Sequence, residues 1–209
     1  MTHTPNLIDA HIILASASPR RRELLSSIGL RFHVLPSTIA EETMDHERPQ
    51  DQVSRLAVAK ATEISGRFPG MWVLGADTIV VIDGKILGKP RDVPEAHEML
   101  AVLAGRTHEV YTGYALVHSD LAAPAVVRWV RSEVHIRSLT AEEIAGYVAT
   151  GEPMDKAGAY AIQGIGSAIV ERISGSYTNV VGLPLCEVTR DLKELGIFTF
   201  LAEQDSNDR

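Results

Sequence analysis

Cationic side chains are concentrated where a helix is expected to begin. Residues 16–21 read Ser-Ala-Ser-Pro-Arg-Arg and directly follow an apolar run at 12–15. This pattern predicts a buried strand, a small-residue turn, and a helix that starts at Pro19 with Ser18 as its N-cap. A cation in the first turn of a helix costs roughly 0.3–1 kcal/mol, whereas an anion is stabilised there. Because free amides and guanidinium groups both favour phosphate, we interpret the stretch as a phosphate cradle.

The side chains of this cradle are ranked as phosphate ligands by their place on the helix. Consecutive helical residues point about 100° apart, so the arginines cannot all face one ligand. Arg20, nearest the turn, is the first candidate and Arg21 the second, and Ser16 and Ser18 are further candidates for substrate binding. The alternative is that the arginines form a solvated face or pair with acids elsewhere in the fold.

A carboxylate interrupts an otherwise apolar strand. Residues 71–81 are continuous β-formers except for Asp77 and Thr78 at their middle. A carboxylate inside a buried strand is costly unless it is paired, coordinated to a metal or open to a cleft, so Asp77 is a candidate for catalysis. The alternative is an Asp in a tight turn between two shorter strands.

Two lysines occur at places where a charge is unexpected. Lys60 lies near the buried edge of a predicted helix over 49–67, and the spacing alone slightly favours a side chain that extends to solvent. Lys89 ends a short strand, which Pro90 stops.

Residues 155–166 are rich in glycine and alanine, which lets backbone approach a ligand closely. Lys156 adds a cation to this stretch, and Gln163 offers both a donor and an acceptor. Acids are available at Asp77 and at Glu41 and Glu42, which are neighbours in the sequence. Several cations that face acids in one cleft indicate metal-assisted phosphoanhydride chemistry on a polyphosphate.

The composition of the chain limits the classes of protein to which it can belong. The chain has 209 residues, of which 45% are hydrophobic and 22% charged, so we expect a soluble globular protein. Its net charge of −7 argues against a nucleic-acid binder. Cys186 is the single cysteine and lies in an apolar context, which favours a buried inert thiol. Residues 1–10 do not resemble a signal peptide and no apolar run is long enough to span a membrane, so a cytoplasmic protein is expected.

The elements that must position these residues alternate between strand and helix. We expect one domain over 1–209, with a polar tail from about 203. The patterns predict a hairpin turn at Asp83-Gly84 and a polar turn at 175–179. They predict further strands over 31–36, 108–117, 126–136 and 168–173, and further helices over 94–103, 140–149 and 186–195.

Four motifs together resemble the Maf family of nucleoside triphosphate pyrophosphatases. They are residues 16–21, Gly75-Ala76-Asp77-Thr78, Gly88-Lys89-Pro90, and residues 155–160 followed by Gln163-Gly164. They occur in the family's order, and the match runs from about Ile12 to Leu195. The resemblance implies an α/β fold like that of inosine triphosphate pyrophosphatases, with a mixed twisted sheet flanked by helices and two lobes around a central cleft. It also suggests a homodimer.

The resemblance implies hydrolysis of a nucleoside triphosphate between its α- and β-phosphates. It places the proton acceptor on Asp77 and specificity positions on Arg20, Thr78 and Gln163. The stretch at 155–160 is similar to that of the branch acting on dTTP and UTP. Our mechanistic hypothesis adds a divalent cation, Mg²⁺ or Mn²⁺, held by Glu41 and Asp77, with Lys60, Lys89 and Lys156 on the phosphates.

Two other classes of function stay open at this point. The chain could be a nucleotide-binding regulator of cell division, since the family name is tied to septum formation. It could also be a general phosphatase or a nucleotidyltransferase. Pyrophosphate release distinguishes the favoured enzyme from a phosphatase, and binding without turnover would indicate the regulator.

Overall fold

The computed structural model describes residues 11–42, 44 and 46–199. The N-terminal segment 1–10 and the polar tail expected from about 203 lie outside these residues. The described strands are β1 (Ile12–Leu14), β2 (His33–Val34), β3 (Trp72–Ile82), β4 (Lys85–Leu87), β5 (Thr107–His118), β6 (Val126–Ile136) and β7 (Val170–Ser174). The α-helices are α1 (Pro19–Ser27), α2 (Pro49–Ser65), α3 (Val93–Leu103), α4 (Ala141–Ala149), α5 (Tyr177–Val181) and α6 (Leu185–Glu194). Three 3₁₀ helices follow α4: η1 (Glu152–Asp155), η2 (Ala157–Ala159) and η3 (Gly164–Ala168).

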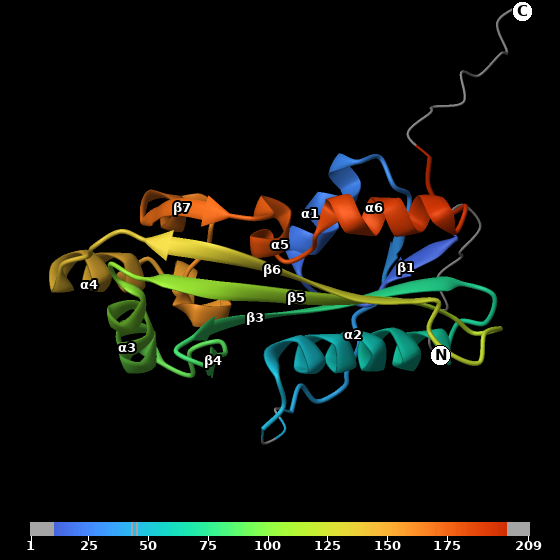
Figure 1. Ribbon diagram of the computed structural model, residues 1–209, viewed down its shortest axis with the longest axis horizontal. Helices are drawn as coiled ribbons and strands as arrows, with labels where there is room; N and C mark the ends of the chain where they lie inside the picture. Colours follow the sequence, from blue (N-terminus) through green and yellow to red (C-terminus); the bar gives the residue numbers. More distant parts are fainter. Residues whose placement is uncertain (1–10, 43, 45, 200–209) are drawn as a thin grey trace, which may run out of the picture.

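The described strands form one seven-stranded mixed sheet, which confirms the predicted fold class. The strand order is β2-β1-β3-β5-β6-β7, and β4 pairs with β3 outside this path. β1 runs parallel to β2 and β3, whereas β3, β5, β6 and β7 form antiparallel pairs. Figure 1 shows α2 on one face of the sheet, α1, α5 and α6 on the other, and α3 and α4 at one end of the long strands.

The edge of β3 has a gap in its pairing. β1 pairs with residues 72–74 of β3, and β4 pairs with residues 80–82 on the same edge. Among the described residues, no strand pairs with 75–79 on this edge, although β5 covers the other edge throughout. The gap lies at Asp77 and Thr78, near the end of β1 and the start of α1. The crevice beyond the carboxyl end of a parallel strand is a common ligand site in α/β proteins.

The apolar core divides into parts that lie on either side of this gap. One cluster packs α3, α4 and the 3₁₀ segment against β3, β5 and β6, and it includes Val80, Val110 and Tyr160. Another packs β1 and β3 against α1 and α6. These two clusters give the chain an apolar core on each side of the gap, in keeping with the two lobes that the family resemblance implies.

Two glycines let α2 approach the sheet at very short range. A Cβ atom on Gly75 of β3 would lie 2.2 Å from the backbone oxygen of Ala57, and one on Gly113 of β5 would lie 2.5 Å from that of Val53. Gly113 stands opposite Asp77 in the sheet register. The close packing therefore brings the side chains of α2 directly over Asp77.

Most predicted elements are confirmed, and two differ in extent or type. β3 is continuous through Asp77, so the alternative of a tight turn at this residue is wrong. The turn at Asp83-Gly84 is confirmed, with φ angles of 51° and 73°. The strand expected over 31–36 is reduced to two residues, and the polar turn expected at 175–179 contains the start of α5, which Ser176 caps.

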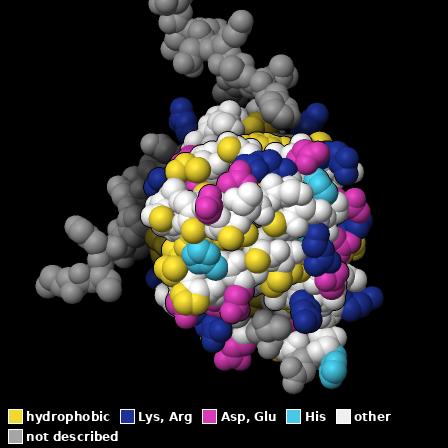
Figure 2. Space-filling view, turned by 90° about the vertical axis from the view of Figure 1, so that its left-hand side faces the viewer, with side chains coloured by type: hydrophobic (Ala, Val, Ile, Leu, Met, Phe, Trp, Pro, Cys, Tyr) yellow, Lys and Arg dark blue, Asp and Glu magenta, His cyan; other side chains and the backbone are white. Residues whose placement is uncertain are grey.

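Cys186 is exposed, which contradicts the prediction of a buried thiol. Leu183 and Pro184, which precede α6, are buried, whereas Cys186 lies on the exposed side of that amphipathic helix. Within the described part of the chain, no helix is both long and apolar enough to cross a membrane. At the end of the molecule formed by α3, α4 and β7, basic and acidic side chains are interspersed (Figure 2).

Candidate active site

A cleft of about 300 Å³ opens at the gap in β3. It is lined by segments from both lobes. Its described lining consists of residues 15–21 after β1, Ser37, Glu41, Lys60, Asp77, Thr78, Val80, Lys89, Val110, residues 155–157, residues 160–162 and residues 180–182. Of the candidate site residues that the sequence singled out, all except Glu42 and Gln163 are in this lining.

The turn before α1 forms as predicted. Ser18 is the N-cap, and its hydroxyl accepts a hydrogen bond from the Arg21 amide at 3.5 Å, with Pro19 in the first turn. Ser16 is buried, and its hydroxyl accepts from the Ser18 amide at 3.3 Å. The serines therefore stabilise the turn that leads into α1. An anion is favoured at the N-terminus of that helix.

Arg21 is buried, and protein oxygens bind most of its guanidinium. The guanidinium donates four hydrogen bonds of 2.8–3.0 Å, to Gly182 O, Ser16 Oγ, Ala76 O and Thr78 Oγ1. Since a guanidinium has five N–H donors, at most one is left for a ligand. Burial lowers the pKa of Arg21, although the charges of Asp77 and Glu41 act in the opposite direction. Arg21 thus ties α1 to β3 and to the segment after α5.

Arg20 is the arginine that faces the cleft. Its side chain is 27% exposed and lies 4.0 Å from Asp155, which also pairs with Lys156. Lys89 lines the same cleft and is exposed, and it makes no hydrogen bond or ion pair within 4.0 Å among the residues described. Arg20, Lys89 and Lys156 are therefore placed to meet a common anion.

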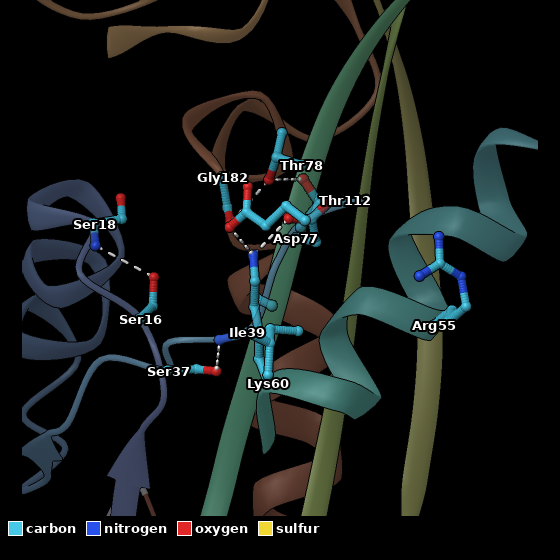
Figure 3. A network of polar contacts seen from close by, with 12 residues as sticks. Ser16, Ser18, Ser37, Ile39, Arg55, Lys60, Asp77, Thr78, Thr112 and Gly182 are labelled. Carbon is cyan, nitrogen blue, oxygen red and sulfur yellow. Dashed lines mark hydrogen bonds and ion pairs between the residues drawn. The ribbon is translucent and has the colours of Figure 1, made fainter. Parts of the chain in front are cut away.

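Lys60 bridges two carboxylates at the centre of the cleft. Its Nζ lies 2.7 Å from Asp77 Oδ1 and 2.7 Å from Glu41 Oε1. Lys60 and Asp77 are both buried, whereas the Glu41 side chain is 54% exposed. Figure 3 shows Lys60 reaching from α2 towards Asp77, with Ser16 and Ser18 across the gap. The expectation that Lys60 extends to solvent is wrong, because the close packing of α2 covers it.

The charges around Lys60 favour the ionised form of Glu41. Burial alone would raise the pKa of Glu41, but the hydrogen bond and charge of Lys60, helped by Lys89, bring it below its ordinary value. Thr78 lies on the other side of β3, where its hydroxyl is 2.9 Å from that of Thr112.

The cleft carries more positive than negative side chains. Its described lining has five cations and three carboxylates, which give a charge of +2 in a chain whose net charge is −7. This local excess of positive charge suits a polyphosphate.

The glycine-rich stretch is tied directly to the Gly88-Lys89-Pro90 motif. The amide of Gly158 donates to the carbonyl oxygen of Gly88 at 3.0 Å. Gly158 has a φ of +69°, and a Cβ on it would lie 3.0 Å from a methyl carbon of Val80. Both the backbone conformation and the close contact favour glycine here. The bond holds Lys89 and Lys156 on the same side of the cleft.

Tyr160 supplies an aromatic side chain to the apolar part of the cleft. It is 5% exposed, and its hydroxyl lies 2.7 Å from Nε2 of His108, a residue of β5 that is 2% exposed. The two rings meet edge to face, with centroids 5.2 Å apart. Burial, together with the charge of His135, lowers the pKa of His108 from 6.5 to about 4. His108 is therefore neutral at pH 7 and supports Tyr160 from behind.

The depressed pKa of His108 predicts a loss of stability in mild acid. The unfolded chain takes up this proton near pH 6.5, but the folded protein only near pH 4. As the pH falls from 6.5 to 4, His108 should therefore lower the free energy of unfolding by about 3 kcal/mol. We expect the midpoint of thermal unfolding to fall less steeply over this range in His108→Gln than in the wild type. The exposed His11→Gln serves as control, and parallel curves for His108→Gln and the wild type would contradict the prediction.

Sequence reasoning assigned most of this site and missed two members. Gln163 is half-buried and follows Ile162, but it is not among the described residues that line the cleft. Asp155 and Tyr160 line it and had no assigned role. Asp155 had a local signal, because it directly precedes Lys156. Tyr160 ends the motif at 155–160, but its contact with His108 of β5 has no local signal in the sequence.

The comparisons with known proteins agree with the motifs. The family model described as Maf-like protein matches residues 11–195. A dTTP/UTP pyrophosphatase of Syntrophotalea carbinolica is 50% identical over 202 residues, which cover 96% of this chain and 91% of that protein. A protein of the same name from Geobacter sulfurreducens is 55% identical over 188 residues, which cover 88% and 96%. The solved dITP/XTP pyrophosphatase of Mycobacterium abscessus aligns over 88% of this chain and 95% of that one, with 16% identity and a TM-score of 0.42.

Proposed function

This chain belongs to the Maf-like protein family, and we propose that it is a pyrophosphatase acting on dTTP and UTP. The products are the nucleoside monophosphate and pyrophosphate. The observation that carries the proposal is the placement of Arg20 and Asp77 in one cleft, together with Lys60, Lys89 and Lys156. The names of relatives at about 50% identity support the choice of nucleotides.

The charged residues of the cleft are assigned three roles. Arg20, Lys89 and Lys156 hold the triphosphate beside the start of α1, where amides and the helix dipole also favour phosphate. Asp77 accepts the proton of a water molecule that attacks the α-phosphorus. Lys60 orients the Asp77 carboxylate through its 2.7 Å contact and offsets its charge in the buried site.

Glu41 and Asp77 would hold a divalent cation. Their oxygens contact the same Lys60 nitrogen, so both carboxylates face one place in the cleft. Mg²⁺ is commonly held by one or two carboxylates with substrate phosphates and water. Among the described residues, no group of three or more His, Cys, Asp or Glu is suited to a metal. Such a cation supplies neutralisation of the phosphate charge.

The pyrimidine is recognised at the apolar end of the cleft. Gln163, which follows the lining residue Ile162, and backbone amides of the glycine-rich stretch are proposed to pair with O2, N3-H and O4 of the base. A site shaped for a pyrimidine would exclude a purine by its size. The homodimer and the cytoplasmic location suggested by the sequence stay predictions.

A nucleotide panel tests the proposed function. dTTP, UTP, CTP, dGTP and 7-methyl-GTP are assayed for pyrophosphate and for orthophosphate, after chelation and after addition of Mg²⁺ or Mn²⁺. We expect metal-dependent release of one pyrophosphate per dTTP or UTP consumed. Release of orthophosphate would indicate a phosphatase, transfer to another acceptor a transferase, and binding without turnover a regulator; each result contradicts the proposal.

A further inference from the structure

One carboxylate and one hydroxyl group organise the segment that follows the glycine-rich stretch. Glu152, at the start of η1, accepts hydrogen bonds from the amides of Ile165 at 2.9 Å and Gly166 at 2.8 Å. Tyr147 of α4 donates its hydroxyl proton to Glu152 at 2.8 Å, and its oxygen accepts from the Ala161 amide at 3.1 Å. Three backbone amides of residues 161–166, hereafter the base loop, thus bind two side chains from outside it.

The base loop closes tightly around these two side chains. A Cβ atom on Gly166 would lie 2.3 Å from the Ala161 oxygen and 2.5 Å from the Tyr147 hydroxyl oxygen. A Cβ on Gly164, whose φ is +69°, would lie 2.4 Å from Glu152 Oε2. The backbone contact at Gly166 and the positive φ of Gly164 both favour glycine, so the glycines and the carboxylate together define one loop conformation.

The charge of Glu152 is stabilised where it lies. Burial alone would raise the pKa of this carboxyl, but the hydrogen bonds from Gly166, Ile165 and Tyr147 outweigh burial and lower it. Glu152 is therefore ionised at neutral pH, and charge strengthens each hydrogen bond that it accepts. Its backbone oxygen also lies 3.4 Å from Lys156 Nζ, which connects the same residue to the phosphate side of the cleft.

The base loop reaches the cleft, but the two side chains that hold it lie outside the described lining of the cleft. Ala161 and Ile162 line the cleft, and Gln163 comes next in the chain. Glu152 and Tyr147 are not among the described residues that line it. A change at either side chain would therefore act on the nucleotide only through the shape of the loop.

We propose that Glu152 and Tyr147 are positioning residues that hold the base loop in the shape that distinguishes pyrimidine from purine nucleotides. This inference rests on the proposed function. A preformed loop favours the ligand that fits it and excludes a larger one, whereas a loosened loop adapts to both. The proposal assigns base selection to side chains that do not contact the base.

The test compares Glu152→Gln and Tyr147→Phe with the exposed Glu142→Gln on α4. Gln at 152 keeps the size of the side chain but cannot accept from all three donors, and Phe at 147 leaves the Ala161 amide unpaired. We expect KM for dTTP to rise about tenfold with kcat within about threefold, and the kcat/KM ratio of dTTP to dGTP to fall about tenfold. Unchanged KM and unchanged ratio in folded variants would overturn the proposal.

A second measurement does not depend on turnover. Amide hydrogen exchange of the nucleotide-free protein should speed up at residues 161–166 in both variants and stay unchanged in Glu142→Gln. Unchanged exchange in the folded variants would overturn the inference. If the wild type itself preferred a purine, the proposed function would fail, and the exchange experiment would still decide whether Glu152 and Tyr147 hold the loop.

Discussion

Asp77→Asn is expected to lower the turnover of dTTP by about 10²–10⁴-fold, the usual contribution of a general base. Asn keeps the shape of the side chain and one oxygen towards Lys60, but it cannot accept the proton of the attacking water. It also removes a negative charge from the pair of acids that would hold the cation. Because Arg20, Lys89 and Lys156 are proposed to hold the triphosphate, the loss of the proton acceptor should appear mainly in kcat.

Steady-state release of pyrophosphate measures this effect, and thermal unfolding shows whether the variant is folded. The matched control is Asp83→Asn, which changes an exposed carboxylate in the β3–β4 turn, where Asn also tolerates the φ of 51°. We expect Asp83→Asn to keep wild-type turnover. A folded Asp77→Asn protein with full turnover would show that the proton acceptor is another group.

Arg21→Met is expected to lower the free energy of unfolding by roughly 3 kcal/mol or more, with loss of activity. The substitution keeps much of the aliphatic stem but removes all four hydrogen bonds of the guanidinium. The carbonyl oxygens of Ala76 and Gly182 are then left without these donors in a buried place, and each such loss costs about 1–3 kcal/mol. The connection between α1 and the exposed edge of β3 is lost with them.

Chemical denaturation at pH 7 measures the free energy of unfolding of each variant. Arg22→Met is the control, because Arg22 is the next residue of α1 and is exposed, so its loss should change stability by no more than about 0.5 kcal/mol. Equal stability of the two variants would contradict the structural role given to Arg21. A stable Arg21→Met protein that had lost only phosphate affinity would instead indicate a direct ligand.

Local patterns in the chain were sufficient to predict the parts of the site that depend on one element. The role of Ser18 as N-cap follows from its position before Pro19. The apolar residues on both sides of Asp77 mark it as a carboxylate inside a buried strand. Both depend on short-range backbone chemistry, which adjacent residues determine. The structure agrees with each of them.

The features that the sequence did not predict depend on contacts between distant elements. Helical spacing places Lys60 near a buried edge but does not show that two carboxylates lie within reach of it. That contact requires Gly75 and Gly113 to admit α2 close to the sheet. In the same way, three consecutive arginines look equivalent in sequence, whereas the tertiary fold buries Arg21, turns Arg20 to the cleft and exposes Arg22.

The most direct test of the central claim is the fate of the oxygen atom from water. dTTP is hydrolysed in water enriched in ¹⁸O, and the masses of both products are measured after a single turnover. Attack on the α-phosphorus from the side of Asp77 predicts one ¹⁸O in the nucleoside monophosphate and none in the pyrophosphate. Label in pyrophosphate, or release of orthophosphate, would contradict the account.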